Sequence, residues 1–299
     1  MAATTEARHA RAEGLDGLPA AAILSVLLDG QLGAVESVRK AIPDIERAAR
    51  LAADKLSAGG RVIYCGAGSS GLMAMADGLE LPGTYGITSD QAPILLAGGE
   101  ESLKLLAGGY EDDVELASED VQALSVNASD CMVCVSASGS TPYTLRAAEN
   151  GRARGAAVIG IANNADTPLL KAADVAVLLA TPPEAIAGST RMGAGTAQKI
   201  ALNMLSTLTA VHLGHVHDGF MVNLRPDNAK LRDRARRMVS VISGTDMDRA
   251  GRLLDEADGS VKIAVLLAAG AEGAQTAGRL LESCNQNLRS ALEKAKAGS

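Results

Sequence analysis

The feature that most constrains the fold is a continuous segment, residues 61–86, which combines a strand, a glycine loop and a helix. Val62–Cys65 is a short apolar run that favours β-structure, and the glycine loop GAGSSG follows it directly at 66–71. The next residues, Leu72–Leu81, predict a helix that ends at Pro82. The order strand, glycine loop, helix is typical of an anion site in an α/β protein.

Two physical properties make this loop suited to a phosphate. Glycines let a ligand approach the backbone closely, and a helix N-terminus presents unpaired N–H groups and the positive end of its dipole. Ser69 and Ser70 add hydroxyl donors. The spacing also fits the GxGxxG motif of dinucleotide-binding proteins, which require an acid at the end of the second strand. Asp90 lies at about the expected distance from the loop, but it belongs to the turn-like TSDQAP and not to a strand end. The dinucleotide interpretation therefore lacks the required acid.

Length and composition indicate one large α/β domain with a small appendage. The chain has 299 residues, of which 47% are hydrophobic and only 2% aromatic, so its core must consist of aliphatic side chains. The formal net charge of −7 argues against a surface for nucleic acid. The longest apolar runs, such as Ala20–Ile23 and Ile263–Ala269, fall short of a membrane span. We therefore expect a cytoplasmic protein with neither a nucleic-acid nor a membrane partner.

Cysteines and histidines do not predict a metal site. Cys131 and Cys134 form a CxxC motif inside a strand pattern, where residues three apart point to opposite faces. His212, His215 and His217 have the spacing of metal ligands, but no carboxylate or cysteine accompanies them. We expect buried cysteines, no metal and no cofactor.

Helices and strands alternate along most of the chain, which predicts a parallel sheet. Two or three helices are expected in 18–57. The further strands are expected at 94–99, 130–135, 156–162 and 175–180, and the further helices at about 101–107, 143–154, 197–213, 223–243, 246–257, 261–269 and 271–296. The helix at 197–213 is apolar on nearly every side and belongs either in a core or in a subunit interface. We expect three parts: a helical segment at 1–57, a sugar-phosphate domain at 58–243 and a small helical subdomain at 244–299.

The strand at 130–135 leads into a second loop that resembles the first, with hydroxyl residues in place of most glycines. Ser136, Ser138 and Thr141 lie in this loop, directly before the next helix. Two such loops on neighbouring parallel strands would place two helix N-termini and several hydroxyls around one phosphate. A sugar phosphate suits that pocket better than a dinucleotide. The alternative is that these hydroxyls only cap their helices.

Seven motifs along the chain resemble those of one family, the N-acetylmuramic acid 6-phosphate etherases, whose core is a sugar isomerase (SIS) domain. They are TEAR at 5–8, GAGSSG at 66–71, ADGLELPGTYG at 76–86, GGYEDD at 108–113, ASGSTPY at 137–143, TPPEAIAGSTRMGAGTAQKIALNMLST at 181–207 and DNAKLRDRA at 227–235. The resemblance implies a three-layer, flavodoxin-like parallel-sheet SIS domain with N-terminal helices and a small C-terminal helical subdomain. It also implies a homodimer that cleaves the lactyl ether of a sugar phosphate.

The resemblance assigns roles by position. Glu80 matches the family's acid/base glutamate and Glu111 its second active glutamate. Phosphate contacts are implied for Ser70, Ser136, Ser138 and Thr141, with Ser69 in the same loop, and weaker substrate contacts for Glu184, Ser189 and Thr190. From the residues alone, Leu79 and Leu81 give Glu80 an apolar setting that would raise its pKa, although an exposed helix-terminal acid is the alternative.

Four departures from the family pattern surround the expected site. Arginines of the family are replaced by Leu72 and Ser140, an acid by Gly108, and the CPP after the key glutamate by Leu-Pro-Gly at 81–83. These leave open the exact substrate, and whether Arg146, Arg191 or a partner subunit supplies the positive charge. Two other functions stay open: a non-catalytic sugar-phosphate sensor similar to glucokinase regulatory protein, and an aldose-ketose isomerase.

Overall fold

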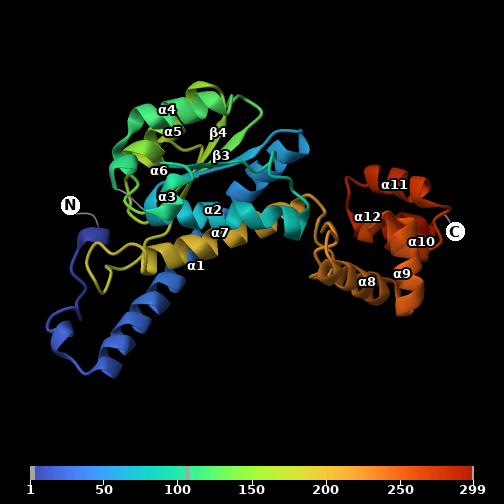
Figure 1. Ribbon diagram of the computed structural model, residues 1–299, viewed down its shortest axis with the longest axis horizontal. Coiled ribbons are helices and arrows are strands. Elements are labelled where there is room, and N and C mark those ends of the chain that lie inside the picture. The colour runs from blue at the N-terminus through green and yellow to red at the C-terminus, as the bar shows by residue number, and fades with distance from the viewer. Residues whose placement is uncertain (1–3, 106–107, 298–299) are drawn as a thin grey trace. The chain divides into compact units, whose positions relative to one another are not determined.

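The computed structural model describes residues 4–105 and 108–297. The chain divides into two compact units (Figure 1). Unit 1 comprises Met1–Leu79 and Asp90–Ser206, and unit 2 comprises Glu80–Ser89 and Thr207–Ser299. The three parts expected from the sequence have other boundaries than these two units. The division into three parts remains a prediction.

Unit 1 contains a five-stranded sheet that is parallel throughout, as the βαβ alternation predicts. The strand order is β2-β1-β3-β4-β5, which is the flavodoxin-like order. The strands are β1 (Val62–Gly66), β2 (Ile94–Leu96), β3 (Cys131–Ser136), β4 (Ala157–Ala162) and β5 (Val175–Leu178). The predicted fold class is therefore confirmed.

Helices cover both faces of the sheet and produce three layers (Figure 1). One face carries α4 (Val114–Ala123), α5 (Pro142–Ala153) and α6 (Pro168–Ala172), and α1 packs on the other. On the first face Met132 and Cys134 of β3 are buried with Tyr143 of α5 in one apolar cluster. All four cysteines are buried and free, as expected for core residues.

The N-terminal region forms one long helix, α1 (Ala20–Ser57), where two or three helices were predicted. The prediction was wrong because one apolar face continues without interruption through Val38, Ile45 and Ala52, all buried, and packing on the sheet outweighs the helix-breaking tendency of Pro43.

By length and composition alone, α1 is long and apolar enough to cross a membrane. The sequence analysis did not predict this, because it considered only uninterrupted apolar runs. One such helix is weak evidence, because core helices of soluble proteins and signal sequences pass the same test.

The helix after the glycine loop, α2 (Gly68–Tyr85), is longer than predicted at both ends. Pro82 lies inside it, because the hydrogen bond from Gly86 N to the carbonyl of Pro82 (3.1 Å) preserves the last turn. The helix ends at Tyr85, and the next residue, Gly86, has a φ of +66°, the left-handed conformation that terminates many helices.

The long apolar helix α7 (Gly193–His212) is a core element in the described structure. Ala201, Leu202 and Leu205 are almost fully buried within the single chain. The sequence left open whether this helix is buried in a core or in a subunit interface. The core of the single chain is sufficient to bury these residues.

The C-terminal helices α9 (Met247–Glu256) and α10 (Val261–Ala268) confirm their predicted positions within one residue, whereas α8 (Ala229–Ser243) begins six residues after the predicted start at 223, because Asn228 caps its first turn. The three helices share an apolar core within unit 2. Their first turns are capped by Asn228, Asp246 and Ser260.

Three other helix predictions needed correction. The helix expected at 271–296 is two, α11 (Ala274–Glu282) and α12 (Leu288–Ala297), because Asn285 and Gln286 between them have positive φ. The helix expected at 101–107 is shorter, α3 (Glu101–Lys104), and residues 106–107 lie outside the described residues. The acidic segment forms a short 3₁₀ helix, Gly108–Asp112, and Asp113 then caps α4, which the sequence did not predict.

Candidate active site

The glycine loop holds β1 and α2 unusually close together. A Cβ on Gly66 would lie 2.8 Å from the Cα of Gly71, so neither position has room for a side chain. Gly68 has a φ of +51°, which alanine adopts only with strain. Gly71 N donates to Ala67 O (2.9 Å) as the first turn closes, and the N–H groups before it have no partner within the helix. Glycine at 66, 68 and 71 is therefore a packing requirement.

The second loop gathers its hydroxyls into one hydrogen-bonded group, the hydroxyl cluster of Ser136, Ser138, Ser140 and Thr141. The Oγ of Ser136 lies 2.8 Å from Thr141 Oγ1 and 3.3 Å from Ser138 Oγ, and Ser140 donates to Ser138. Thr141 occupies the N-cap position of α5 but makes no side-chain cap hydrogen bond. Capping thus fails to account for its hydroxyl, which faces the cluster.

The two loops meet directly. Ser70 Oγ accepts a hydrogen bond from the backbone N–H of Ala137 (3.3 Å), across the neighbouring strands β1 and β3. These strands flank the point where the strand order reverses, which is where ligands bind in open α/β sheets. The structure therefore brings together Ser70 and the hydroxyl cluster, as the sequence predicted, and Ser69 lies half-buried in the first turn of α2.

Glu111 lies against the first loop. Its carboxylate is the nearest group to Gly68, where an added Cβ would come within 3.1 Å of the Glu111 Cδ. Partial burial raises the pKa of Glu111, and the neighbouring charge of Asp112 raises it further. A raised pKa favours the protonated form of a carboxyl group, and the protonated form can act as an acid.

Glu80 does not have the predicted apolar setting. It is exposed, and its neighbour Leu79 is 64% exposed, so only Leu81 is buried. That prediction was wrong because the face of α2 that carries Leu79 and Glu80 points to solvent. Twelve residues separate Glu80 from Gly68 on α2, which corresponds to about 18 Å at 1.5 Å per residue.

The buried acid of α2 is Asp77, which the sequence analysis missed. It accepts hydrogen bonds from Tyr64 (2.8 Å), Asn203 (2.6 Å) and Ser206 (3.1 Å), which join α2 to β1 and α7. Burial raises the pKa of Asp77, and the three donors oppose that rise. An aspartate within the otherwise apolar AMADGL, one turn before Glu80, was the available signal.

Glu184 has an internal role in the described structure. Its two carboxylate oxygens accept from Gly193 N (3.0 Å) and Ala194 N (2.8 Å) at the start of α7, and the side chain is buried. It therefore satisfies a helix N-terminus, as an anion would. Ser189 and Thr190 are half-buried in the loop before α7.

The positions that depart from the family pattern carry little positive charge. Leu72 is half-buried in α2, and Ser140 joins the hydroxyl cluster. Arg146 on α5 pairs with Glu149 (3.5 Å), and Arg191 is exposed before α7. The cluster consists of neutral donors and acceptors.

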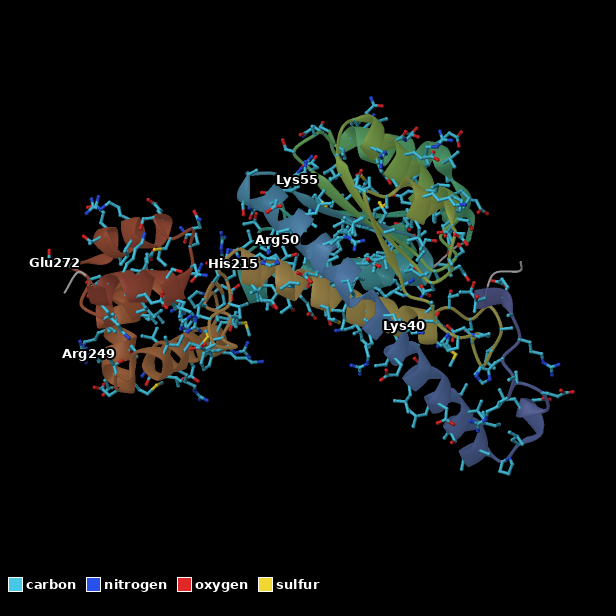
Figure 2. All side chains as sticks on the ribbon, turned by 180° about the vertical axis from the view of Figure 1, so that it is seen from behind. Lys40, Arg50, Lys55, His215, Arg249 and Glu272 are labelled. Carbon is cyan, nitrogen blue, oxygen red and sulfur yellow. The ribbon has the colours of Figure 1, made fainter. Side chains whose placement is uncertain are left out.

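The histidines after α7 have separate environments. The backbone of His217 exchanges hydrogen bonds with that of Phe220. His215, labelled in Figure 2, is partly buried, and burial lowers its pKa to about 4. Within residues 4–105 and 108–297, no group of three or more His, Cys, Asp or Glu residues is arranged to hold a metal ion.

Comparison with known proteins agrees with this architecture. The family model of the SIS domain matches residues 33–163, which include both loops, so this part of the chain is similar to a SIS domain. N-acetylmuramic acid 6-phosphate etherase of Deinococcus radiodurans is 45% identical over 98% of this chain and 96% of its own length. The enzyme of that name from Streptomyces avermitilis is 40% identical over 98% and 94%. The chain belongs to the N-acetylmuramic acid 6-phosphate etherase family.

A solved structure of a phosphoheptose isomerase from Francisella tularensis also aligns. The alignment covers 65% of this chain and 98% of the isomerase chain, with 19% identity and a TM-score of 0.49.

Proposed function

We propose that this protein cleaves the C3 lactyl ether of N-acetylmuramic acid 6-phosphate to give N-acetylglucosamine 6-phosphate and D-lactate. The observation that carries the proposal is the junction of two loops at the carboxyl ends of β1 and β3, with the Glu111 carboxyl beside them. The junction suits the phosphate ester through Ser70 and the hydroxyl cluster. Family membership supplies the reaction.

The chemistry needs one base and one acid. In the open-chain sugar the aldehyde makes the C2 proton acidic. A carboxylate removes this proton, the C2–C3 double bond forms, and the C3–O bond breaks as an acid protonates the departing lactate oxygen. Water then adds to the unsaturated aldehyde, with its hydroxyl at C3 and its proton at C2. General acid and base steps of this kind are each worth about 100- to 10,000-fold.

The two glutamates divide these roles in our proposal. The raised pKa of Glu111 favours the protonated form, which suits the acid that protonates lactate. Glu80 is exposed and lies about 18 Å along α2 from Gly68, too far to share one sugar with Glu111 of the same copy, so in the homodimer proposed below the base is Glu80 of the second copy. The assignment of Glu80 is supported by its family position.

We further propose a cytoplasmic homodimer. Leu24, Leu28 and Leu32 recur every four residues along α1 and are 65%, 59% and 56% exposed, which leaves an apolar stripe for a second copy. Light scattering of the purified chain tests this: a monomer at micromolar concentration would contradict it.

The direct test is D-lactate release from N-acetylmuramic acid 6-phosphate by the purified protein. We expect Glu80→Gln and Glu111→Gln each to lower kcat by about 100- to 10,000-fold, whereas Glu119→Gln, an exposed acid on α4, leaves it unchanged. A folded protein that releases no lactate would refute the proposal. Sugar-phosphate binding without turnover would then indicate a sensor, and aldose-ketose interconversion without lactate an isomerase.

A further inference from the structure

The N-terminal segment contains a residue, Thr5, that is buried although its neighbours Thr4 and Glu6 are exposed. Thr5, in the 3₁₀ turn Thr4–Glu6, is 2% exposed. Its N–H donates to Asn164 Oδ1 (3.3 Å), and its Oγ1 accepts from Asn164 Nδ2 (3.0 Å). Two hydrogen bonds therefore join Thr5 to one side chain that lies 159 positions away in the sequence.

Asn164 also contacts the second loop and so links Thr5 to it. Its Nδ2 also donates to the carbonyl of Ala137 (3.1 Å), which accepts from Asn163 N as well (3.0 Å). The N–H of the same residue, Ala137, donates to Ser70. Both peptide groups of Ala137 are thereby fixed, one by Ser70 of the first loop and the other by Asn163 and Asn164 together.

Ala137 is the residue between Ser136 and Ser138, whose hydroxyls belong to the hydroxyl cluster. A rotation of either peptide group of Ala137 would turn at least one of these hydroxyls away from the cluster. Binding groups of this kind need positions fixed within a fraction of an ångström. The contact from Thr5 therefore acts on the geometry of the cluster without contacting it.

The same segment also contacts the loop before α7. Gly188 N donates to the carbonyl of Thr5 (3.1 Å), and a Cβ on Gly188 would lie 3.3 Å from Glu6 Oε2. Ser189 and Thr190 follow directly in the chain. The N-terminal segment thus connects two loops that are far apart in sequence.

We propose that Thr5 is a positioning residue: through Asn164 it holds Ala137 and the hydroxyl cluster in the arrangement that binds the phosphate monoester of an amino sugar. This inference rests on the proposed function for the identity of the ligand. It adds a role for the N-terminal TEAR motif, which the catalytic proposal leaves unused.

The test compares Thr5→Val, which keeps the shape and removes the hydroxyl, with Thr5→Ser, which keeps it. Thr4→Val is the matched control at an exposed neighbour. Calorimetry measures the Kd of N-acetylglucosamine 6-phosphate, of unphosphorylated N-acetylglucosamine and of inorganic phosphate, and D-lactate assays measure KM and kcat.

We expect Thr5→Val to raise the Kd of N-acetylglucosamine 6-phosphate and of phosphate, and the KM, by about tenfold, which corresponds to one hydrogen bond. The kcat should change less than about twofold, because the reacting groups lie elsewhere. Affinity for the unphosphorylated sugar should be unchanged, Thr5→Ser should restore the wild-type values, and Thr4→Val should match wild type.

A lowered Tm with unchanged Kd and KM in Thr5→Val would overturn the inference, because it would reveal a purely structural role. An equal loss of affinity for the unphosphorylated sugar would do the same. If Thr5→Val does not fold, Asn164→Asp decides by the same criteria, since it keeps the acceptor for the Thr5 N–H and removes the donor to Ala137. The Kd measurements need no turnover, so a wild-type protein that binds the sugar phosphate without releasing lactate refutes the proposed function and still tests this inference.

Discussion

Substitution of Gly68 by alanine tests whether the position of the Glu111 carboxyl matters for activity. Two effects are expected. The φ of +51° is the left-handed region, which costs an alanine about 1–2 kcal/mol. The new Cβ also collides with Glu111 Oε1 and lies 3.1 Å from Cδ, closer than ordinary van der Waals contact, so the carboxyl group must move.

Gly99 provides a control for the first effect alone. Its φ of +53° is nearly the same, but an added Cβ meets nothing within 4 Å. Both alanine variants should lose about 1–2 kcal/mol of stability, a fall in Tm of about 2–4 °C per kcal/mol for a chain of this size. Only Gly68→Ala should also lower kcat/KM, by about 100-fold if the carboxyl shifts by about 1 Å.

Thermal unfolding followed by circular dichroism and the D-lactate assay measure these quantities, at a temperature well below both midpoints. If the two variants lose the same activity, or if Gly68→Ala keeps wild-type kcat/KM, the carboxyl group of Glu111 has no role at this position. That result would refute the assignment of Glu111 as the acid.

Three further predictions concern ionisable groups. Burial lowers the pKa of Lys262 from 10.5 to about 8, or about 3 kcal/mol at 1.36 kcal/mol per pH unit, so its contribution to stability is complete above pH 10.5 and is lost as the pH falls to 8. Lys262→Met removes this cost of about 3 kcal/mol but loses the bond to Gln286 O, worth about 1 kcal/mol, so it should be about 2 kcal/mol more stable than wild type at pH 7 in urea unfolding. Above pH 10.5 only the lost bond counts, and the variant should be about 1 kcal/mol less stable than wild type; a variant that is less stable at pH 7 would contradict this. Asp77→Asn should lower the free energy of unfolding by about 1–3 kcal/mol, because an amide cannot accept from every donor around it. Burial raises the pKa of Asp77, so wild type itself becomes less stable as the pH rises above 3.8 through that pKa, and the difference between the two proteins should narrow. A constant difference from pH 4 to 7 would argue against titration of Asp77 in this range. The kcat/KM of the wild type should fall as the pH rises through the raised pKa of Glu111, since the acid loses its proton, and Glu111→Gln should lack this fall in a pH–rate profile.

Some structural features were readable from local patterns. The strands at β1, β3 and β4 are continuous runs of buried apolar residues, and the loops after β1 and β3 have compositions that only tight turns before helices use. Chain order then fixed a parallel sheet, because each strand is followed by a helical crossover. Helix ends were less predictable: a proline stopped neither α1 nor α2, since packing and hydrogen bonds on either side outweighed its local cost.

The candidate site was predictable in part for the same reason. Ser136 is the last residue of β3, Ser138 and Thr141 follow it within five residues, and Ser70 lies four residues after β1. The parallel register of β1 and β3 therefore brings them to one edge of the sheet. Three other features depend on contacts over more than a hundred residues: the bonds of Asp77 to α7, the contact of Thr5 with Asn164, and the exposure of Glu80, which follows from which face of α2 packs inward.

The sequence by itself determined the segment 61–86 as strand, glycine loop and helix, because steric room at glycine and apolar runs are local properties. Only the tertiary structure decided which acid of that segment is buried. Asp77 and Glu80 are three positions apart on one helix, but the donors on β1 and α7 surround Asp77 alone. A carboxylate is buried only where its hydrogen bonds are supplied, and those donors come from distant parts of the chain.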